Sequence, residues 1–144
     1  MIITFHIQAD QLIIDTDLND FEQQINKTLP NDYRQHMLQY NGGGIDKFNL
    51  AHVVDETYGA YGLAYLFALK YDSTTIESIF TAYQDDYPVG YIPIGVAAGG
   101  GEFIMSLNND ETYGEIKILE EDGIMEYLSP SFSQFLEDMV EIKG

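Results

Sequence analysis

Apolar and polar positions repeat with helical spacing in a stretch of the chain that also carries its own start and stop signals. Tyr33, Met37 and Tyr40 fall at i, i+4 and i+7, between Pro30 and the run 41–44, which reads Asn-Gly-Gly-Gly. Apolar residues at this spacing form one face of an α-helix. Proline suits the first helical turn, where a missing N–H costs nothing, and Asn followed by glycines can adopt the positive φ that ends a helix. The pattern therefore predicts a helix between these two signals, with its apolar face against a core.

Three further segments show helical spacing. The first helix is expected to start at Thr16 or Asp17, either of which can cap it. Residues 74–77 read Thr-Thr-Ile-Glu, a capping box with its acid three residues after a Thr74 cap, and predict a second start. The last helix is expected to start at Ser129-Pro130 or at Ser131. The apolar positions that support these helices are Leu18, Phe21 and Ile25, then Ile76, Ile79, Phe80 and Tyr83, then Phe132, Phe135, Leu136 and Met139.

Strand patterns occupy much of the remaining chain. Phe103, Met105 and Leu107 alternate onto one face, and residues 114–119 return after a turn, which predicts a hairpin. Residues 63–71 fit either a helix or a strand by pattern alone. We favour a buried central strand for this run, because a new helix starts soon after it.

The other strand predictions are shorter. Residues 91–95 read Tyr-Ile-Pro-Ile-Gly, and they predict an edge or irregular strand because proline lacks the N–H that a central strand donates. Residues 57–62 have a loop composition with aromatic side chains. One or two short edge strands are predicted over 2–7 and 11–15, and further short strands at 48–57 and 124–128. The expected fold is α+β, a single domain with a largely antiparallel sheet of about six strands, near residues 50, 65, 92, 105, 116 and 126, packed with helices.

Several of these segments resemble the motifs of one protein family, the SUKH superfamily. It contains fungal Smi/Knr-type cell-wall regulators, the bacterial Syd protein and many bacterial toxin-immunity proteins. The opening motif is a Glu, seven residues, Pro, two residues, Tyr, then Asn-Gly-Gly. The chain shows this spacing at Glu22, Pro30, Tyr33 and Asn41-Gly42-Gly43.

The second half of the chain shows the later motifs of the same family in order. Glu102 stands where an Asp is more familiar, and the segment 46–72 carries no motif that matches. The matching segments are Ile92-Pro93-Ile94-Gly95, Gly100-Gly101-Glu102, residues 103–107, residues 114–118 and the run 131–136, Ser-Phe-Ser-Gln-Phe-Leu. The resemblance covers residues 16–140. It implies a non-enzymatic protein-binding domain, either a bacterial immunity protein that neutralises a cognate toxin, often a nuclease, or a regulatory scaffold like the fungal relatives.

Composition narrows the classes of partner. The 144 residues contain six Lys plus Arg against 24 Asp plus Glu, a formal charge of −18 at pH 7. Such a charge repels nucleic-acid phosphates and anionic lipid, and it attracts a basic protein. The chain has no cysteine, which excludes a disulfide framework and thiolate metal sites. With neither a membrane-length apolar run nor a basic N-terminal region, we expect a cytoplasmic protein.

The usual catalytic and ligand-binding patterns do not occur in the sequence. His6, His36 and His52 stand apart, without the spacing of metal ligands. Asp15, Asp17 and Asn19 match the first ligands of an EF-hand, but the sixth and twelfth positions are not Gly and Glu. Neither glycine run continues into a phosphate-binding motif, and no nucleophile elbow is present. We therefore expect no catalytic residues, no metal and no cofactor.

Acidic residues gather in the C-terminal part of the chain, on turns and outward strand positions of the predicted hairpins. One interpretation is a solvated face, and the other is a docking surface for a basic protein, such as a toxin domain. The family resemblance gives the docking surface the same weight as the solvated face, and both interpretations stay open. The predicted partner-binding residues are Glu102, Glu115, Glu120, Glu121, Asp122 and Glu126.

Overall fold

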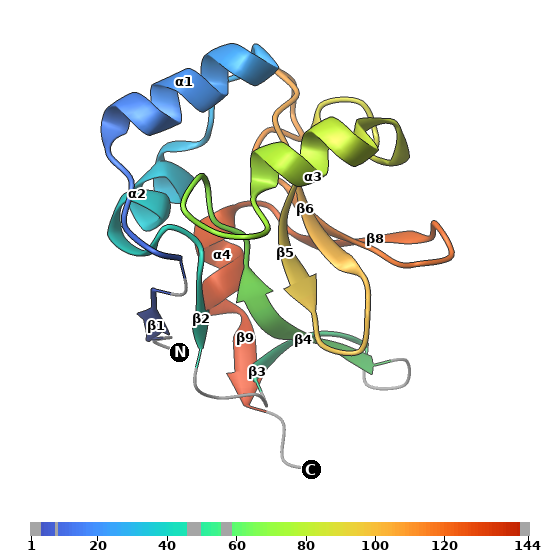
Figure 1. The fold of residues 1–144 in the computed structure, drawn as a ribbon. Coiled ribbons are helices and arrows are strands. Elements are labelled where there is room, and N and C mark those ends of the chain that lie inside the picture. The colour runs from blue at the N-terminus through green and yellow to red at the C-terminus, as the bar shows by residue number, and fades with distance from the viewer. Residues whose placement is uncertain (1–3, 8, 46–49, 56–58, 142–144) are drawn as a thin grey trace.

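A computed structural model describes residues 4–7, 9–45, 50–55 and 59–141. The helices are α1 (Asp15–Ile25), α2 (Asn31–Tyr40), α3 (Ile76–Tyr83) and α4 (Phe132–Glu137), with a 3₁₀ turn η1 (Gln84–Asp86). The strands are β1 (Phe5–His6), β2 (Gly43–Ile45), β3 (Leu50–Asp55), β4 (Gly59–Leu66), β5 (Tyr91–Ala97), β6 (Glu102–Ser106), β7 (Ile116–Leu119), β8 (Met125–Ser129) and β9 (Met139–Glu141). Figure 1 shows their arrangement.

The sheet is antiparallel throughout the described residues. Its main path runs β1-β2-β4-β5-β6-β7-β8, and β3 pairs with both β4 and β9. In Figure 1, β8 extends away from the helices at the far edge of the sheet. The α+β prediction is confirmed, and all six predicted strand regions are present as β3 to β8.

The two faces of the central strands are covered differently. Phe103 on β6 faces α4, and its ring meets the ring of Phe135 edge-on at a centroid distance of 5.0 Å. Ile104, the next residue, lies on the opposite face and packs against Tyr87 and Tyr91. Residues of α3 cover part of this second face, and the rest of it stays open. The alternation of a strand therefore supplies both a main core and a second, smaller one.

The Glu and Pro of the family motif stabilise the junction between α1 and α2. Glu22 accepts a hydrogen bond from the Leu29 backbone N–H at 2.7 Å, and its other oxygen accepts one from Arg34 at 2.7 Å. Pro30 is the residue before the first turn of α2, where its fixed φ suits the start of the helix. The Glu and Pro of the motif therefore fix how the two helices join.

Asn41 ends α2 in the left-handed conformation, with φ of 46°, as its sequence context predicts. Its side chain is fully buried. The amide nitrogen donates to the carbonyls of Leu69 (2.9 Å) and Gln11 (3.2 Å), and the amide oxygen accepts from the Leu69 N–H (2.9 Å). One side chain thus forms hydrogen bonds with backbone groups of two other segments.

Some local predictions were wrong. The predicted strand 63–71 ends at Leu66 and begins earlier, because residues 59–62 of the predicted loop belong to β4. Of the one or two strands expected over 2–7 and 11–15, only β1 is present in the described residues, and α1 starts at Asp15 after an Ile14 cap. The helix cap is Thr75, whose hydroxyl accepts from the Ser78 N–H, and is not Thr74 with its acid. Residues 2–3, 48–49 and 56–58 of the other predictions lie outside the described residues.

Pro93 lies in β5, a central strand, so the expectation of an edge strand was wrong. The expected irregularity is present, because the register between β5 and β6 shifts between Pro93 and Gly95. Gly95 also lets β4 approach closely, since a Cβ there would lie 2.8 Å from the Tyr65 carbonyl oxygen. A bulge removes the need for the donor that proline lacks, so proline is tolerated inside the sheet.

His36 is a buried ionisable group inside an aromatic cluster. Its ring lies 4.7 Å from the ring of Phe5 and 5.0 Å from that of Phe132, and its Nε2 lies 2.7 Å from the Gly42 carbonyl oxygen. Burial lowers the pKa of His36 to about 4, although the bond to Gly42 opposes the shift. The folded protein therefore holds this imidazole neutral at neutral pH.

We expect the protein to lose stability as the pH falls, because the folded state holds His36 in its neutral form. The unfolded chain takes up a proton near pH 6.5 and the folded one only near pH 4, so stability is lost as pH falls through this window. Between pH 7.5 and 5 the loss should be about 2 kcal/mol. Urea unfolding at both pH values measures it, and His36→Gln should remove this part of the slope. His6→Gln, at an exposed histidine, is the control; an equal slope in the wild type and the His36 variant would contradict the argument.

Candidate functional site

A row of neighbouring residues crosses five strands on the open face of the sheet. The strand register places Tyr65 beside Val96, Val96 beside Glu102, Glu102 beside Leu119, and Leu119 beside Met125. Residues directly opposite each other on antiparallel strands project from the same face. The row therefore consists of one carboxylate with two apolar or aromatic side chains on each side.

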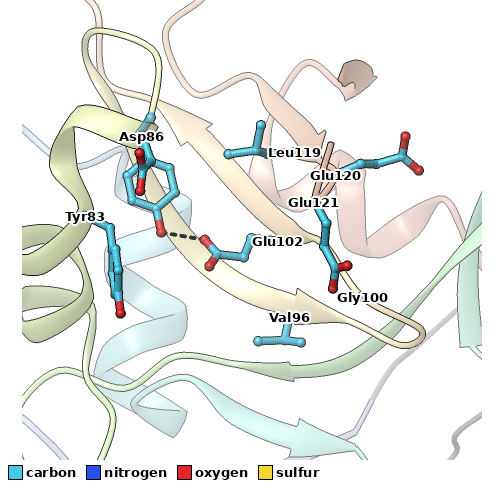
Figure 2. A pocket seen from close by; sticks show the side chains of 10 residues that line it. Tyr83, Asp86, Val96, Gly100, Glu102, Leu119, Glu120 and Glu121 are labelled. Carbon is cyan, nitrogen blue, oxygen red and sulfur yellow. Dashed lines mark hydrogen bonds between the residues drawn. The ribbon is translucent and has the colours of Figure 1, made fainter. Parts of the chain in front are cut away.

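A groove of about 410 Å³ lies over the middle of this row (Figure 2). Tyr83, Asp86 and Tyr87, from α3, η1 and the residue after it, line one side. The turn at Gly100 and the side chain of Glu121 line the other. Tyr83 is 57 % exposed, so its ring is available to a binding partner.

Glu102 is held in a fixed direction by Tyr87. The Tyr87 hydroxyl donates to Glu102 Oε2 at 2.5 Å, and Figure 2 shows the carboxylate turned toward it. Burial raises the pKa of Tyr87 strongly, and the bond to Glu102 raises it further. The phenol therefore stays protonated at neutral pH and acts as a permanent donor to the carboxylate.

The structure divides the six predicted acids among different places. Glu102 and Glu121 line the groove, and η1 adds Asp86 to them. Glu120 also borders the groove, but Figure 2 shows its carboxylate directed away from it. Asp122 lies in the β7–β8 turn and accepts from the Ile124 N–H at 3.0 Å.

Glu120 and Glu126 form a second acidic pair on the other face of the sheet. Both accept hydrogen bonds from the Tyr61 hydroxyl, at 3.1 and 3.3 Å. Burial, followed by the bond to Glu120, raises the pKa of Tyr61 to about 12. The two carboxylates share one donor, so this pair keeps two negative charges close together at the rim of the sheet.

Glu115 is separate from both groups. Its carboxylate lies 3.6 Å from the Lys117 ammonium and 3.5 Å from the Tyr91 hydroxyl, which donates to it. Lys117 lies in turn over the ring of Tyr91, at 5.2 Å from the centroid. A carboxylate with its own cation adds little net charge to a docking surface.

Sequence reasoning missed the residues that complete the groove. No role was predicted for Asp86 and Tyr87, and Tyr83 was counted among the apolar positions of a helix. Only the antiparallel order of β4 to β8, which no local pattern states, brings Tyr65 and Met125 into the row of Glu102. One signal in the sequence could have suggested that Glu102 pairs with Leu119. It is a predicted strand of alternating apolar residues opposite a strand that carries a single acid.

Metal sites and membrane-spanning helices are two other classes of feature to consider in the described part of the chain. There, no group of three or more His, Asp or Glu side chains is arranged to hold a metal ion. None of the helices described is long and apolar enough to cross a membrane.

Comparison with known proteins gives two matches. The model of the SMI1 / KNR4 family (SUKH-1) matches residues 13–138. The SPbeta prophage-derived uncharacterized protein YokK of Bacillus subtilis (strain 168) is 23 % identical over 146 aligned positions, which cover 86 % of this chain and 73 % of that protein. The family match spans both helices of the opening motif, the groove and α4.

Proposed function

The chain belongs to the SMI1 / KNR4 family (SUKH-1), and on that premise we propose that it is a non-enzymatic binding protein of the bacterial immunity type. It binds a basic toxin domain, such as a nuclease, and neutralises it. The similar Bacillus protein is prophage-derived, which is consistent with this role.

The observation that carries the proposal is an apolar row with acids on both sides of its groove. Val96 and Leu119 offer apolar surface that a partner can cover, while Asp86 and Glu121 stand at opposite sides. A nuclease holds phosphate with Lys and Arg side chains, so its cleft is complementary to such a surface. The charge of −18 extends this attraction over the whole chain.

The protonation state of Tyr87 in the groove supports a binding function over a catalytic one. A general base or nucleophile is effective when its pKa lies near the working pH. Tyr87 is buried, its pKa is raised, and its proton is engaged by Glu102. This pair therefore serves to orient a carboxylate and offers no group that is ready to transfer a proton.

Removing charge around the groove should slow association with the toxin domain. We expect the triple variant Asp86→Asn, Glu121→Gln and Asp122→Asn to lower the association rate about tenfold at low salt, because complementary charge acts mainly on the encounter. The difference should shrink at about 0.5 M salt, where the screening length is only a few ångströms. Stopped-flow binding to an inactivated cognate toxin domain measures the rates, and co-expression with that toxin measures protection.

The control removes the same charge elsewhere. Asp20→Asn, Glu111→Gln and Glu137→Gln alter three exposed acids away from the groove. Asp15 and Asp17 are unsuitable, because Asp15 lies near Arg34 and Asp17 caps α1 and pairs with Lys70. Equal rates for the two triple variants, with full protection by both, would show that the acids are only solvated surface.

A further inference from the structure

The lone carboxylate in the row sets a condition on any partner that covers it. Glu102 has Val96 on one side and Leu119 on the other, so a partner that buries these side chains also removes water from the carboxylate. Burying an ionised carboxylate without a counter-charge is costly. An occupant that brings a cation to Glu102 avoids this cost.

The part of the chain that the structure describes does not supply this cation. Tyr87 occupies Glu102 Oε2, and none of the described residues donates a hydrogen bond to Oε1. Lys117, on the same face, is engaged with Glu115 and the ring of Tyr91. Glu102 is therefore oriented, with one oxygen open toward the groove.

The shape of the groove selects the kind of cation. A guanidinium is flat, donates two parallel hydrogen bonds to a carboxylate and stacks on aromatic rings, whereas an ammonium is a compact, strongly hydrated charge. Tyr83 offers an exposed ring at the side of the groove, and Val96 and Leu119 offer apolar surface for the methylenes of a long side chain.

We propose that the groove is a receptor for an arginine side chain of the basic partner. The guanidinium pairs with Glu102 and stacks on Tyr83, and Asp86 and Glu121 strengthen the negative potential at the sides. This inference rests on the proposed binding function, and it adds the residue type that the partner inserts.

The test uses small probes, so it needs no toxin. N-acetyl-arginine amide, N-acetyl-lysine amide and N-acetyl-citrulline amide are titrated into the ¹⁵N-labelled protein at low salt and followed by NMR. We expect saturable shifts at Val96, Glu102 and Leu119, at least fivefold tighter binding of arginine than of lysine, and no saturation with the uncharged citrulline. Shifts spread over all acidic surfaces with equal affinity for lysine would overturn the proposal.

Variants separate the groove from general charge. Glu102→Gln should weaken arginine binding at least tenfold, and Tyr87→Phe severalfold, because the carboxylate then loses its orienting donor. Glu115→Gln, which removes an acid from the same face of the sheet outside the groove, should change the affinity less than twofold. Tyr83→Ala, at an exposed side chain, should weaken binding at least threefold and serves if Glu102→Gln fails to fold. Equal effects of Glu102→Gln and Glu115→Gln would overturn the proposal.

The outcome is independent of the toxin experiment. Selective arginine binding without protection of cells would leave the groove assignment standing and remove the toxin from the proposed function. Protection of cells without selective arginine binding would leave the immunity function standing and overturn the arginine receptor.

Discussion

Replacing Asn41 with alanine is expected to lower the free energy of unfolding by about 3–5 kcal/mol. The substitution leaves the buried N–H and the buried carbonyl of Leu69 without their partner, and it removes a further, partly buried bond to the Gln11 carbonyl. Each unsatisfied buried group costs about 1–3 kcal/mol. Alanine must also adopt the left-handed backbone at φ of 46°, which costs about 1 kcal/mol more.

Asn26 offers a matched control for this prediction. It also ends a helix in the left-handed conformation, with φ of 54°, but its side chain is exposed. Asn26→Ala should therefore cost only the backbone term, about 1 kcal/mol. Urea unfolding of both variants at pH 7.5 gives the comparison. Similar losses for the two variants would mean that the hydrogen bonds of Asn41 contribute nothing beyond its backbone conformation.

Gly42→Ala should destabilise the fold as strongly, through a different cause. A Cβ at this position would lie 2.4 Å from the Phe67 carbonyl oxygen, and the backbone φ of 84° already disfavours a side chain. The obstacle is backbone at the end of β4, so it cannot move without disturbing strand pairing. We expect a loss above about 3 kcal/mol, which sums the strained backbone and overpacking against a rigid neighbour.

Gly99 separates the cost of backbone strain from the cost of the steric contact. Its φ of 88° is nearly the same, yet a Cβ there would meet nothing within 4 Å. Gly99→Ala should therefore cost only the strain of the positive φ, about 1–2 kcal/mol. Thermal and urea unfolding of both alanine variants measure the difference. If the Gly99 variant loses as much stability as the Gly42 variant, the contact with Phe67 is not what requires glycine at position 42.

The sequence was most informative where a local pattern decides the structure. The alternation of Phe103, Met105 and Leu107 predicted a strand of the hairpin because each strand buries one face. The Asn-Gly-Gly run predicted a helix end because few other residues accept positive φ. The segment 63–71 was harder, since Phe67, Ala68 and Leu69 are buried without belonging to a strand.

The acidic surface was harder to predict because neighbouring acids in sequence do not share a face. Glu120 and Glu121 are adjacent, yet Glu121 lines the groove and Glu120 turns its carboxylate toward Tyr61. Period-two alternation separates such neighbours. The charge count predicted a partner class, while the position of Glu102 beside Val96 depends on a long-range register that only the folded sheet defines.

The pair of carboxylates on the Tyr61 hydroxyl also protects the molecule from its own copies. Among the described strands, β8 pairs only with β7, so it forms one edge of the sheet, and it exposes Met125 and Tyr127. An exposed edge with apolar side chains invites edge-to-edge aggregation, which proteins avoid by placing charges on short edge strands. Glu126 lies between them in the sequence and projects from the opposite face of β8, so a second copy that added its β8 in register would bring like charges together. Glu126, which was predicted to bind a partner, thus also disfavours pairing between the β8 edges of two copies.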